Sequence, residues 1–300
     1  KNPFPFILSK GDPISLLQIL TTIDRLGTRH GFNSLTTIVS TQSDDGGFPR
    51  DFQKGFPSSV KTTYRTLKIL HKVGIDKRSY IMNSALNWLI NQQNTDGGWH
   101  ENPAINLPEW MTWESTSKSV TWYTCQIGIL LQQLQMQNTD TFRKIINFFA
   151  SSELPNGGWG AVIGLNERDD DSTVGIADFL AQVLGERYPA VSRARNIFDS
   201  SMAKLIARVK SERVEDAYEL THIIFENPQN SMYRTGDERV NTLLRALVEA
   251  QREDGGWLTF YSGGKSDVPM SVYSLQILVS YGVLDKSILQ NMFDVALKEG

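Results

Sequence analysis

Three consecutive aspartates, Asp169 to Asp171, are the residues of this sequence best placed to do acid–base chemistry. They follow the glycine-rich stretch 157–160 and precede Ser172, Thr173 and an apolar run that predicts a helix over 174–184. Adjacent carboxylates repel one another, so at least one should have a raised pKa if water is scarce around it. A carboxylic acid that stays protonated near neutral pH can act as a general acid. The structural alternative is an ordinary N-cap, because Asp and Ser are favoured before a helix.

A seven-residue pattern occurs four times and predicts a repeat fold. It begins with Gln or Glu, has Gly-Gly at its fifth and sixth positions and ends on an aromatic residue, at 42–48, 93–99, 153–159 and 251–257. The aromatic positions are 51, 60 and 98 residues apart, so the last gap spans about two repeats. Glycine supplies a tight turn and the aromatic side chain fills the gap between neighbouring hairpins. The three tryptophans of the pattern are therefore predicted to be structural: Trp99, Trp159 and Trp257.

Between these turns the apolar residues recur with the helical period near 3.6. First helices are predicted near 16–23, 60–70, 120–134, 174–184, 217–225 and 272–281. Second helices are predicted near 34–42, 79–92, 139–151, 189–209, 237–251 and 286–298. Six such pairs predict an all-α fold, an (α/α)6 barrel (toroid) of six helical hairpins, in a single domain over 1–300. A solenoid of six pairs is the alternative.

Two stretches, 1–12 and 100–115, stand outside this pattern. The second contains proline and several aromatic residues and is too long for a simple connection. It is a candidate lid or cavity wall, or else a surface loop packed on the barrel rim.

The composition excludes several classes of function. A net charge of -3 without a basic patch argues against nucleic acid as a partner. Cys125 is the sole cysteine, so no disulfide forms within the chain, which fits a reducing, cytoplasmic compartment. The four histidines lack ligand spacing, and no metal site is expected. No signal peptide and no apolar run of about 18 residues is present. Because the sequence starts at Lys1 rather than Met, we expect that an N-terminal portion was removed.

The aspartates can be compared with the same level of the other repeats. Alignment on the helix-ending glycines Gly74 and Gly185 places Asp169, Asp171 and Thr173 opposite Ser58, Val60 and Thr62. The third and sixth repeats have hydroxyl or aliphatic residues near this level, so the fourth repeat alone is expected to be acidic there. A single Ser or Thr is enough for a cap, and three Asp add repulsion. The comparison therefore favours a functional role.

These motifs resemble those of the terpene cyclase and prenyltransferase superfamily. The Gln-x-x-x-Gly-Gly-Trp turns resemble its QW motif over residues 42–257, and Asp169 to Thr173 resembles the Asp-x-Asp-Asp/Thr-Thr motif of class II terpene cyclases, squalene–hopene cyclase included. The resemblance implies that Asp171 is the acid that protonates a terminal double bond or epoxide, with Asp169 as its carboxyl partner and Thr173 as a supporting hydroxyl. Asp170 adds a charge that is unusual at the motif's second position.

Such a reaction also needs an apolar cavity lined by aromatic faces, which stabilise a carbocation and exclude water. The candidates for this substrate-binding role are Trp110, Trp113, Trp122, Tyr123, Phe260 and Tyr261. The last two begin a segment, 260–269, that resembles the final aromatic, glycine-rich loop of triterpene cyclases. Trp122 and Tyr123 are adjacent on a predicted helix and cannot face the same way.

The sequence also departs from the family pattern. Squalene-type cyclases carry a histidine before the Gln of the following turn, where this chain has Ala250. His222, on the next predicted inner helix, is a candidate substitute, and a core histidine is the alternative. Class II enzymes usually place the cavity between two barrels. We therefore expect either a second cyclase domain outside this sequence or a cavity within the single barrel.

The expected function is that of a class II terpene cyclase, an isomerase that closes rings on a linear isoprenoid, either a prenyl diphosphate or a squalene-like polyene. One alternative is a non-catalytic α/α barrel that binds an isoprenoid or a protein. Another is a protein prenyltransferase β-subunit-like protein, but Tyr123 stands two residues before Cys125 where that family's zinc site has Asp.

The expected partners are the isoprenoid substrate, a second cyclase domain or a second copy of the chain in a homodimer, and peripheral contact with a membrane. No cofactor is expected unless a diphosphate substrate brings Mg²⁺. Ser172, in place of the motif's fourth-position Asp, favours the diphosphate-using bacterial enzymes.

Overall fold

The computed structural model describes residues 1–222 and 236–299, except for the side chains of Trp110, Asp171 and Glu299. The chain divides into two compact units, and each is considered by itself. Unit 1 combines Lys1–Leu35 with Asn196–Gly300, and unit 2 is Thr36–Arg195. The single-domain prediction stays a prediction, because this division does not decide it.

The described residues confirm the all-α class and the alternation of first and second helices. The first helices are α2 (Pro13–Thr22), α4 (Val60–Lys72), α6 (Thr121–Gln133), α8 (Asp170–Leu184), α10 (Ala217–Thr221) and α12 (Val268–Ser280). The second helices are α3 (Arg29–Thr41), α5 (Tyr80–Asn91), α7 (Asp140–Ser152), α9 (Pro189–Ser211), α11 (Glu238–Glu249) and α13 (Lys286–Glu299). The predicted extension of α10 to residue 225 lies outside the described residues.

Some elements were not predicted. Helix α1 (Phe4–Lys10) buries Phe4 and Ile7 and packs on α12 and α13 in unit 1. A short antiparallel pair, β1 (Trp257–Leu258) and β2 (Ser266–Asp267), and the 3-10 helices η1 (Arg50–Phe52), η2 (Glu109–Ser115) and η3 (Phe260–Ser262) lie in loops. No helix among the described residues has the length and apolar character needed to span a bilayer.

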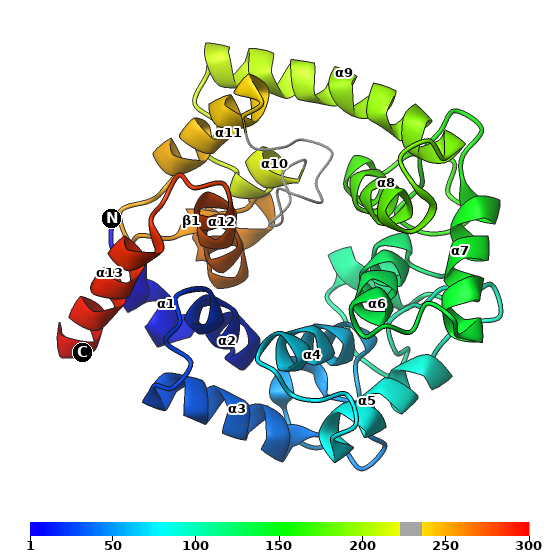
Figure 1. Ribbon diagram of the computed structural model, residues 1–300, viewed down its shortest axis with the longest axis horizontal. Coiled ribbons are helices and arrows are strands. Elements are labelled where there is room, and N and C mark those ends of the chain that lie inside the picture. Colours follow the sequence, from blue (N-terminus) through cyan, green and yellow to red (C-terminus); the bar gives the residue numbers. More distant parts are fainter. Residues whose placement is uncertain (223–235, 300) are drawn as a thin grey trace. The chain divides into compact units, whose positions relative to one another are not determined.

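In unit 2, α4, α6 and α8 lie side by side, and α5 and α7 cover their outer faces (Figure 1). The closest packing is between α6 and α8, where the ring of Phe179 lies against Gly128. In unit 1, α12 packs on α1, α2, α10 and β1.

The Gly-Gly-aromatic turns fasten each hairpin to the previous one through their tryptophans. The buried indole N–H groups donate to a carbonyl ten residues earlier, from Trp99 to Leu89 at 2.8 Å, from Trp159 to Phe149 at 2.9 Å and from Trp257 to Leu247 at 2.7 Å. The first glycine also has to be glycine. At Gly97, φ is +95° and an added Cβ would lie 2.4 Å from the Lys144 carbonyl oxygen. The structure therefore supports the predicted structural role of these tryptophans.

A second set of hydrogen bonds, here called the hydroxyl clips, joins each turn to the inner helix that follows. The backbone N–H of the turn's aromatic residue donates to a buried hydroxyl in the first turn of that helix. The pairs are Phe48 with Thr63 (2.9 Å), Trp99 with Thr124 (3.2 Å), Trp159 with Thr173 (2.9 Å) and Trp257 with Ser271 (2.8 Å). The clips fix how each inner helix is rotated and where it begins.

The clips show that the predicted alignment of the repeats was wrong by one residue. Thr173 is equivalent to Thr63, not to Thr62. The error came from the terminal glycines, which differ in their distance from the helix. Gly185 is itself the C-cap of α8, whereas the C-cap of α4 is Val73 and Gly74 follows it.

The segment 100–115 is held to unit 2 by two buried glutamates. The Glu101 carboxylate accepts hydrogen bonds from Val60 N and Ser59 Oγ, both at 2.7 Å, at the positive N-terminus of α4. The backbone carbonyl of Glu114 accepts from Glu101 N at 2.7 Å, and its carboxylate accepts from the Tyr123 hydroxyl at 2.5 Å. These contacts favour a fixed wall over a lid.

The clips make a testable prediction about stability. Thr124→Val removes the acceptor of the buried Trp99 N–H and should lower the free energy of unfolding by about 1 to 3 kcal/mol, because a buried donor is left without a partner. Urea denaturation followed by circular dichroism measures the change. Thr112→Val, at an exposed hydroxyl on η2, is the matched control and should stay within about 0.5 kcal/mol. Equal losses in the two variants would contradict the role given to the clips.

Candidate functional site

Asp169 is the N-cap of α8. Its Oδ2 accepts from Ser172 N at 2.8 Å, and its own N–H donates to the Trp159 carbonyl at 2.9 Å. Asp267 caps α12 in the same way, accepting from Met270 N at 2.8 Å. Asp12 and Asp216 cap α2 and α10. The prediction that only the fourth repeat is acidic at this level is therefore wrong for Asp169, whose cap is the common choice among the inner helices.

The two aspartates after the cap are what distinguish the fourth repeat. Two residues beyond the N-cap, the six inner helices carry Ile14, Lys61, Trp122, Asp171, Tyr218 and Pro269. One residue beyond it they carry Pro13, Val60, Thr121, Asp170, Ala217 and Val268. An acid occurs at these levels in α8 alone. The side chain of Asp171 lies outside the described residues.

The turn before α8, at 153–159, also replaces a polar pair that the other three turns share. In those turns an aspartate accepts from a serine just before the inner helix: Asp45 from Ser58 (2.7 Å), Asp96 from Ser119 (2.8 Å) and Asp254 from Ser266 (2.7 Å). The turn before α8 has Asn156 and Arg168 instead. This change was visible in the sequence, but a comparison of the aspartates alone missed it.

Arg168 turns towards the aspartates. Its Nε donates to Asp170 Oδ1 at 2.8 Å, and its stem covers Gly158, where an added Cβ would lie 2.6 Å from Arg168 Cδ. Compared with the Asp–Ser pair of the other turns, Asn156 and Arg168 remove one carboxylate from this turn and add one guanidinium. The change lowers the repulsion between the clustered carboxylates.

Thr173 is fully buried and forms the clip of α8. Its Oγ1 accepts from Trp159 N at 2.9 Å and donates to the Trp159 carbonyl at 3.1 Å. Because the Thr173 hydroxyl is engaged with Trp159, Thr173 supports the aspartates by fixing the position of the turn.

Asp178 is a buried acid that the sequence analysis missed. It lies on α8, 8% exposed, and its carboxylate accepts from Gln182 Nε2 at 2.9 Å. Burial raises its pKa to about 7, against the opposing effect of the Gln182 hydrogen bond. The sequence signal was a lone Asp in an apolar run, seven residues after Asp171 and so on the same helical face.

The aromatic candidates of unit 2 differ in exposure. Trp122 is 37% exposed and lies on Gly175 of α8, where an added Cβ would be 2.8 Å from Trp122 Cζ3. Tyr123 is 1% exposed and directed to Glu114, so the two neighbours do face different ways. Trp113 is partly exposed on η2, and the side chain of Trp110 lies outside the described residues.

The remaining candidates belong to unit 1. Tyr218 stacks on His222 with ring centroids 6.5 Å apart and meets Tyr261 edge-on at 6.3 Å. Phe260 and Tyr261 are 64% and 58% exposed on η3, and the Phe260 N–H donates to Asp216 Oδ2 at 2.9 Å. His222 Nδ1 lies 2.6 Å from the Glu219 carbonyl. The three aspartates belong to unit 2, whereas these aromatic residues and His222 belong to unit 1.

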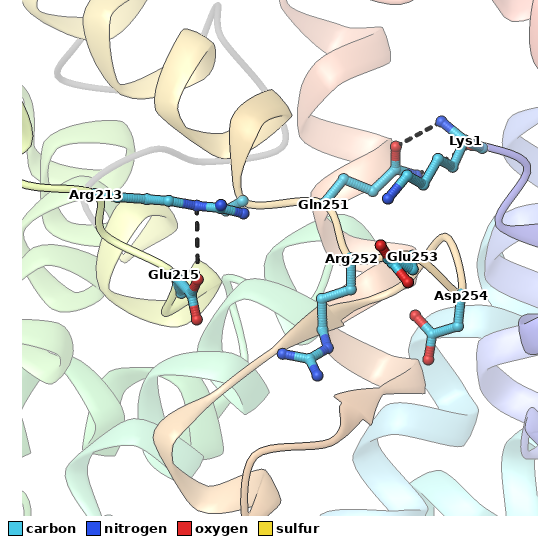
Figure 2. Close-up of a pocket in the computed structure, with 8 residues that line it drawn as sticks. Lys1, Arg213, Glu215, Gln251, Arg252, Glu253 and Asp254 are labelled. Atoms are coloured by element: carbon cyan, nitrogen blue, oxygen red, sulfur yellow. Dashed lines mark hydrogen bonds and ion pairs between the residues drawn. The ribbon is translucent and has the colours of Figure 1, made fainter.

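Unit 1 contains an open pocket of about 550 Å³, shown in Figure 2. Its lining is mainly charged, and Ala250 stands where the family resemblance predicted a histidine. Figure 2 shows Arg213 directed to Glu215 and Gln251 directed to Lys1. A lining of this kind does not suit a hydrocarbon chain.

Within the described residues no group of three His, Cys, Asp or Glu side chains could hold a metal ion. Cys125 is fully buried, and burial raises the pKa of its thiol, which disfavours the thiolate that binds metals.

Comparison with known proteins identifies the fold. Residues 16–164 match the sequence model of the squalene-hopene cyclase C-terminal domain. The chain has a squalene–hopene cyclase-like fold. Solved structures agree: a protein from Actinoplanes is 15% identical, with 90% of each chain covered and a TM-score of 0.58. The type II terpene cyclase MstE from Scytonema is 13% identical, with 90% of this chain and 87% of that one covered and a TM-score of 0.57.

These likenesses establish the fold, an all-α fold of the terpene cyclase α/α-barrel type, and not the activity. A novel α-amylase from Clostridium perfringens also resembles the chain, at 12% identity, with 92% of this chain and 86% of that one covered and a TM-score of 0.53. No curated protein sequence matches the chain. Function therefore has to be argued from the residues of the site.

The raised pKa of Asp178 predicts how stability depends on pH. The folded protein holds a proton that the unfolded chain releases between pH 3.8 and about 7, so stability falls as the pH rises through this window. Asp178→Asn cannot ionise and should gain about 2 to 4 kcal/mol relative to the native chain between pH 4 and pH 8.

Urea denaturation at both pH values measures this difference. Asp140→Asn, at an exposed site on α7 where Lys144 and Arg143 lower the pKa of the carboxyl, is the control and should show no such gain at high pH. Parallel pH profiles for the native chain and Asp178→Asn would show that Asp178 ionises normally.

Proposed function

We propose that this protein is a class II terpene cyclase that closes rings on a linear isoprenoid by protonating it from Asp171. The observation that carries the proposal is the pattern at the inner helix starts. Among six equivalent positions two residues after the N-cap, Asp171 is the sole acid, and the chain has a squalene–hopene cyclase-like fold. Because Asp169 already supplies the cap, capping does not explain Asp171.

The proposed reaction begins with a carboxylic acid at Asp171. The π electrons of the terminal double bond form a C–H bond with its proton, which leaves a carbocation and an Asp171 carboxylate. The next double bond attacks the cation and closes a ring, and the last cation loses a proton or takes up water. Asp169 is the carboxyl partner, and Arg168 offsets the charge of Asp170 at 2.8 Å.

The bound states of a similar protein support the substrate class. MstE from Scytonema has been solved with geranylgeranyl dihydroxybenzoate as substrate and with merosterolic acid A as product. A fold of this kind therefore accommodates a long isoprenoid. The partly exposed rings of Trp122 and Trp113 are proposed to face the substrate in this chain. The assignments of Phe260 and Tyr261 to substrate binding and of His222 to a supporting role stay predictions from the sequence. Mg²⁺ is proposed only as the companion of a diphosphate substrate.

Asp171→Asn tests the proposal directly. Turnover should fall by about 10² to 10⁴-fold, because the amide cannot donate the proton, while the free energy of unfolding stays nearly unchanged. Products formed from farnesyl diphosphate, geranylgeranyl diphosphate and squalene would be quantified by mass spectrometry. The matched control is Asp267→Asn, which removes a carboxylate charge from the start of α12 but keeps a good N-cap, so stability and turnover should both stay close to native. Native turnover in Asp171→Asn would exclude this residue as the acid.

A second experiment restores the common turn in the fourth repeat. Asn156→Asp combined with Arg168→Ser rebuilds the Asp–Ser pair of the other turns, so the double variant should fold with native stability. Turnover should nevertheless fall by about tenfold or more, because Asp170 loses its guanidinium and a carboxylate is added nearby. Full turnover in a stable double variant would show that Arg168 serves only the turn.

A further inference from the structure

Helix α4 carries a row of four cations on one face. The row consists of Lys61, Arg65, Lys68 and Lys72, which are spaced at i, i+4, i+7 and i+11. Between Val60 and Leu70, Lys61, Arg65 and Lys68 are the residues that remain partly exposed, and Lys72 is exposed. Apart from the half-buried His71, the residues between them are buried. These four residues are here called the α4 stripe.

The next two inner helices show equivalent faces with different chemistry. By the register of the clips, the α4 stripe corresponds on α6 to Trp122, Gln126, Ile129 and Gln133, and on α8 to Asp171, Gly175, Asp178 and Gln182. The face is thus basic on α4, neutral with one indole on α6, and acidic on α8.

Contacts within unit 2 show that these faces adjoin. Lys68 Nζ donates to Gln126 Oε1 at 2.8 Å, which joins α4 to α6. Trp122 lies on Gly175, which joins α6 to α8. The buried Cys125 of α6 is close enough to both Lys68 and Asp178 to sense their charges. On α4 and α6 the residues of these faces are partly or fully exposed.

The charges of the α4 stripe are only partly balanced. Lys61 Nζ pairs with Glu114 Oε1 at 3.3 Å and lies 5.8 Å from the centre of the Tyr123 ring. Arg65 and Lys72 make no hydrogen bond or ion pair with any residue that the structure describes. Like charges at i, i+4 destabilise a helix, so the row brings the fold no stability.

We propose that the α4 stripe binds the anionic end, a phosphate or carboxylate group, of the isoprenoid whose other end is protonated on α8. This inference rests on the proposed function and narrows its substrate from any polyene to an anionic isoprenoid. The guanidinium of Arg65 binds an oxyanion through two hydrogen bonds, and Lys61 and Lys68 flank it by one helical turn. Trp122, between the two ends, faces the hydrocarbon. A neutral polyene such as squalene has no group for these cations.

Calorimetric titration of the full chain with three probes tests this site. Geranylgeranyl diphosphate, geranylgeranoic acid and geranylgeraniol share a hydrocarbon and differ in the head group, so the acid and the diphosphate distinguish the two anions. At least one anionic probe should bind about tenfold or more tightly than the alcohol. Arg65→Gln should weaken that probe by about ten- to hundredfold and leave the alcohol unchanged.

The matched control is Arg143→Gln, which removes the same charge from α7, on the outer side of unit 2. It should change the affinity of no probe by more than about twofold. Equal affinity for the alcohol and both anions would overturn the proposal, and so would equal losses in Arg65→Gln and Arg143→Gln.

The experiments distinguish failure of the α4 stripe from failure of the proposed cyclase function. Binding of an anionic probe that depends on Arg65, without any cyclic product, would sustain the α4 stripe and refute the cyclase. Cyclisation of geranylgeranyl diphosphate and geranylgeranoic acid at the native rate by Arg65→Gln would sustain the cyclase and refute the α4 stripe.

Discussion

The structure depends on the hydroxyl clip, the hydrogen bond from the turn's aromatic N–H to a buried Thr or Ser at the start of the next inner helix. Each clip satisfies a donor that would otherwise be buried without a partner, and in the three turns that end on tryptophan the indole N–H satisfies a carbonyl of the preceding helix. Together they set the level and the rotation of an inner helix. Because that register is fixed, Asp171 can be compared with Lys61, Trp122 and Pro269, and the N-caps of α2 and α10 add Ile14 and Tyr218.

Within that constant register the fourth repeat changes its polar groups. Glu153 stands where the other turns have Gln and forms an ion pair with Arg193 at 2.6 Å, and Asn156 and Arg168 replace the Asp–Ser pair. The clip at Thr173 is kept. Different groups therefore serve stability and chemistry. The clip and the N-cap are common to the repeats, whereas Asp170, Asp171 and Arg168 are specific to the fourth repeat. Local departures from a repeated rule are where function is expected.

The sequence predicted the twelve paired helices and the turns because hydrophobic period and Gly-Gly signals are local. It predicted the acidic stretch but not its register, since counting from Gly74 and Gly185 assumed equal helix ends that the two C-caps do not share. Asp178 escaped notice because a lone carboxylate in an apolar run shows nothing of its burial until α6 is packed beside it. The α4 stripe was missed because charges at helical spacing look like a solvated surface until the contact of Lys68 with α6 is known.

The central claim, that ring closure begins with a proton from the α8 acid, is tested most directly by turnover in D₂O. The account predicts a product that carries one deuterium, in the ring methylene formed from the CH carbon of the terminal double bond, with the label and the product both absent from Asp171→Asn. A cyclic product without deuterium at that carbon would mean that the reaction starts by another route, and it would contradict the account.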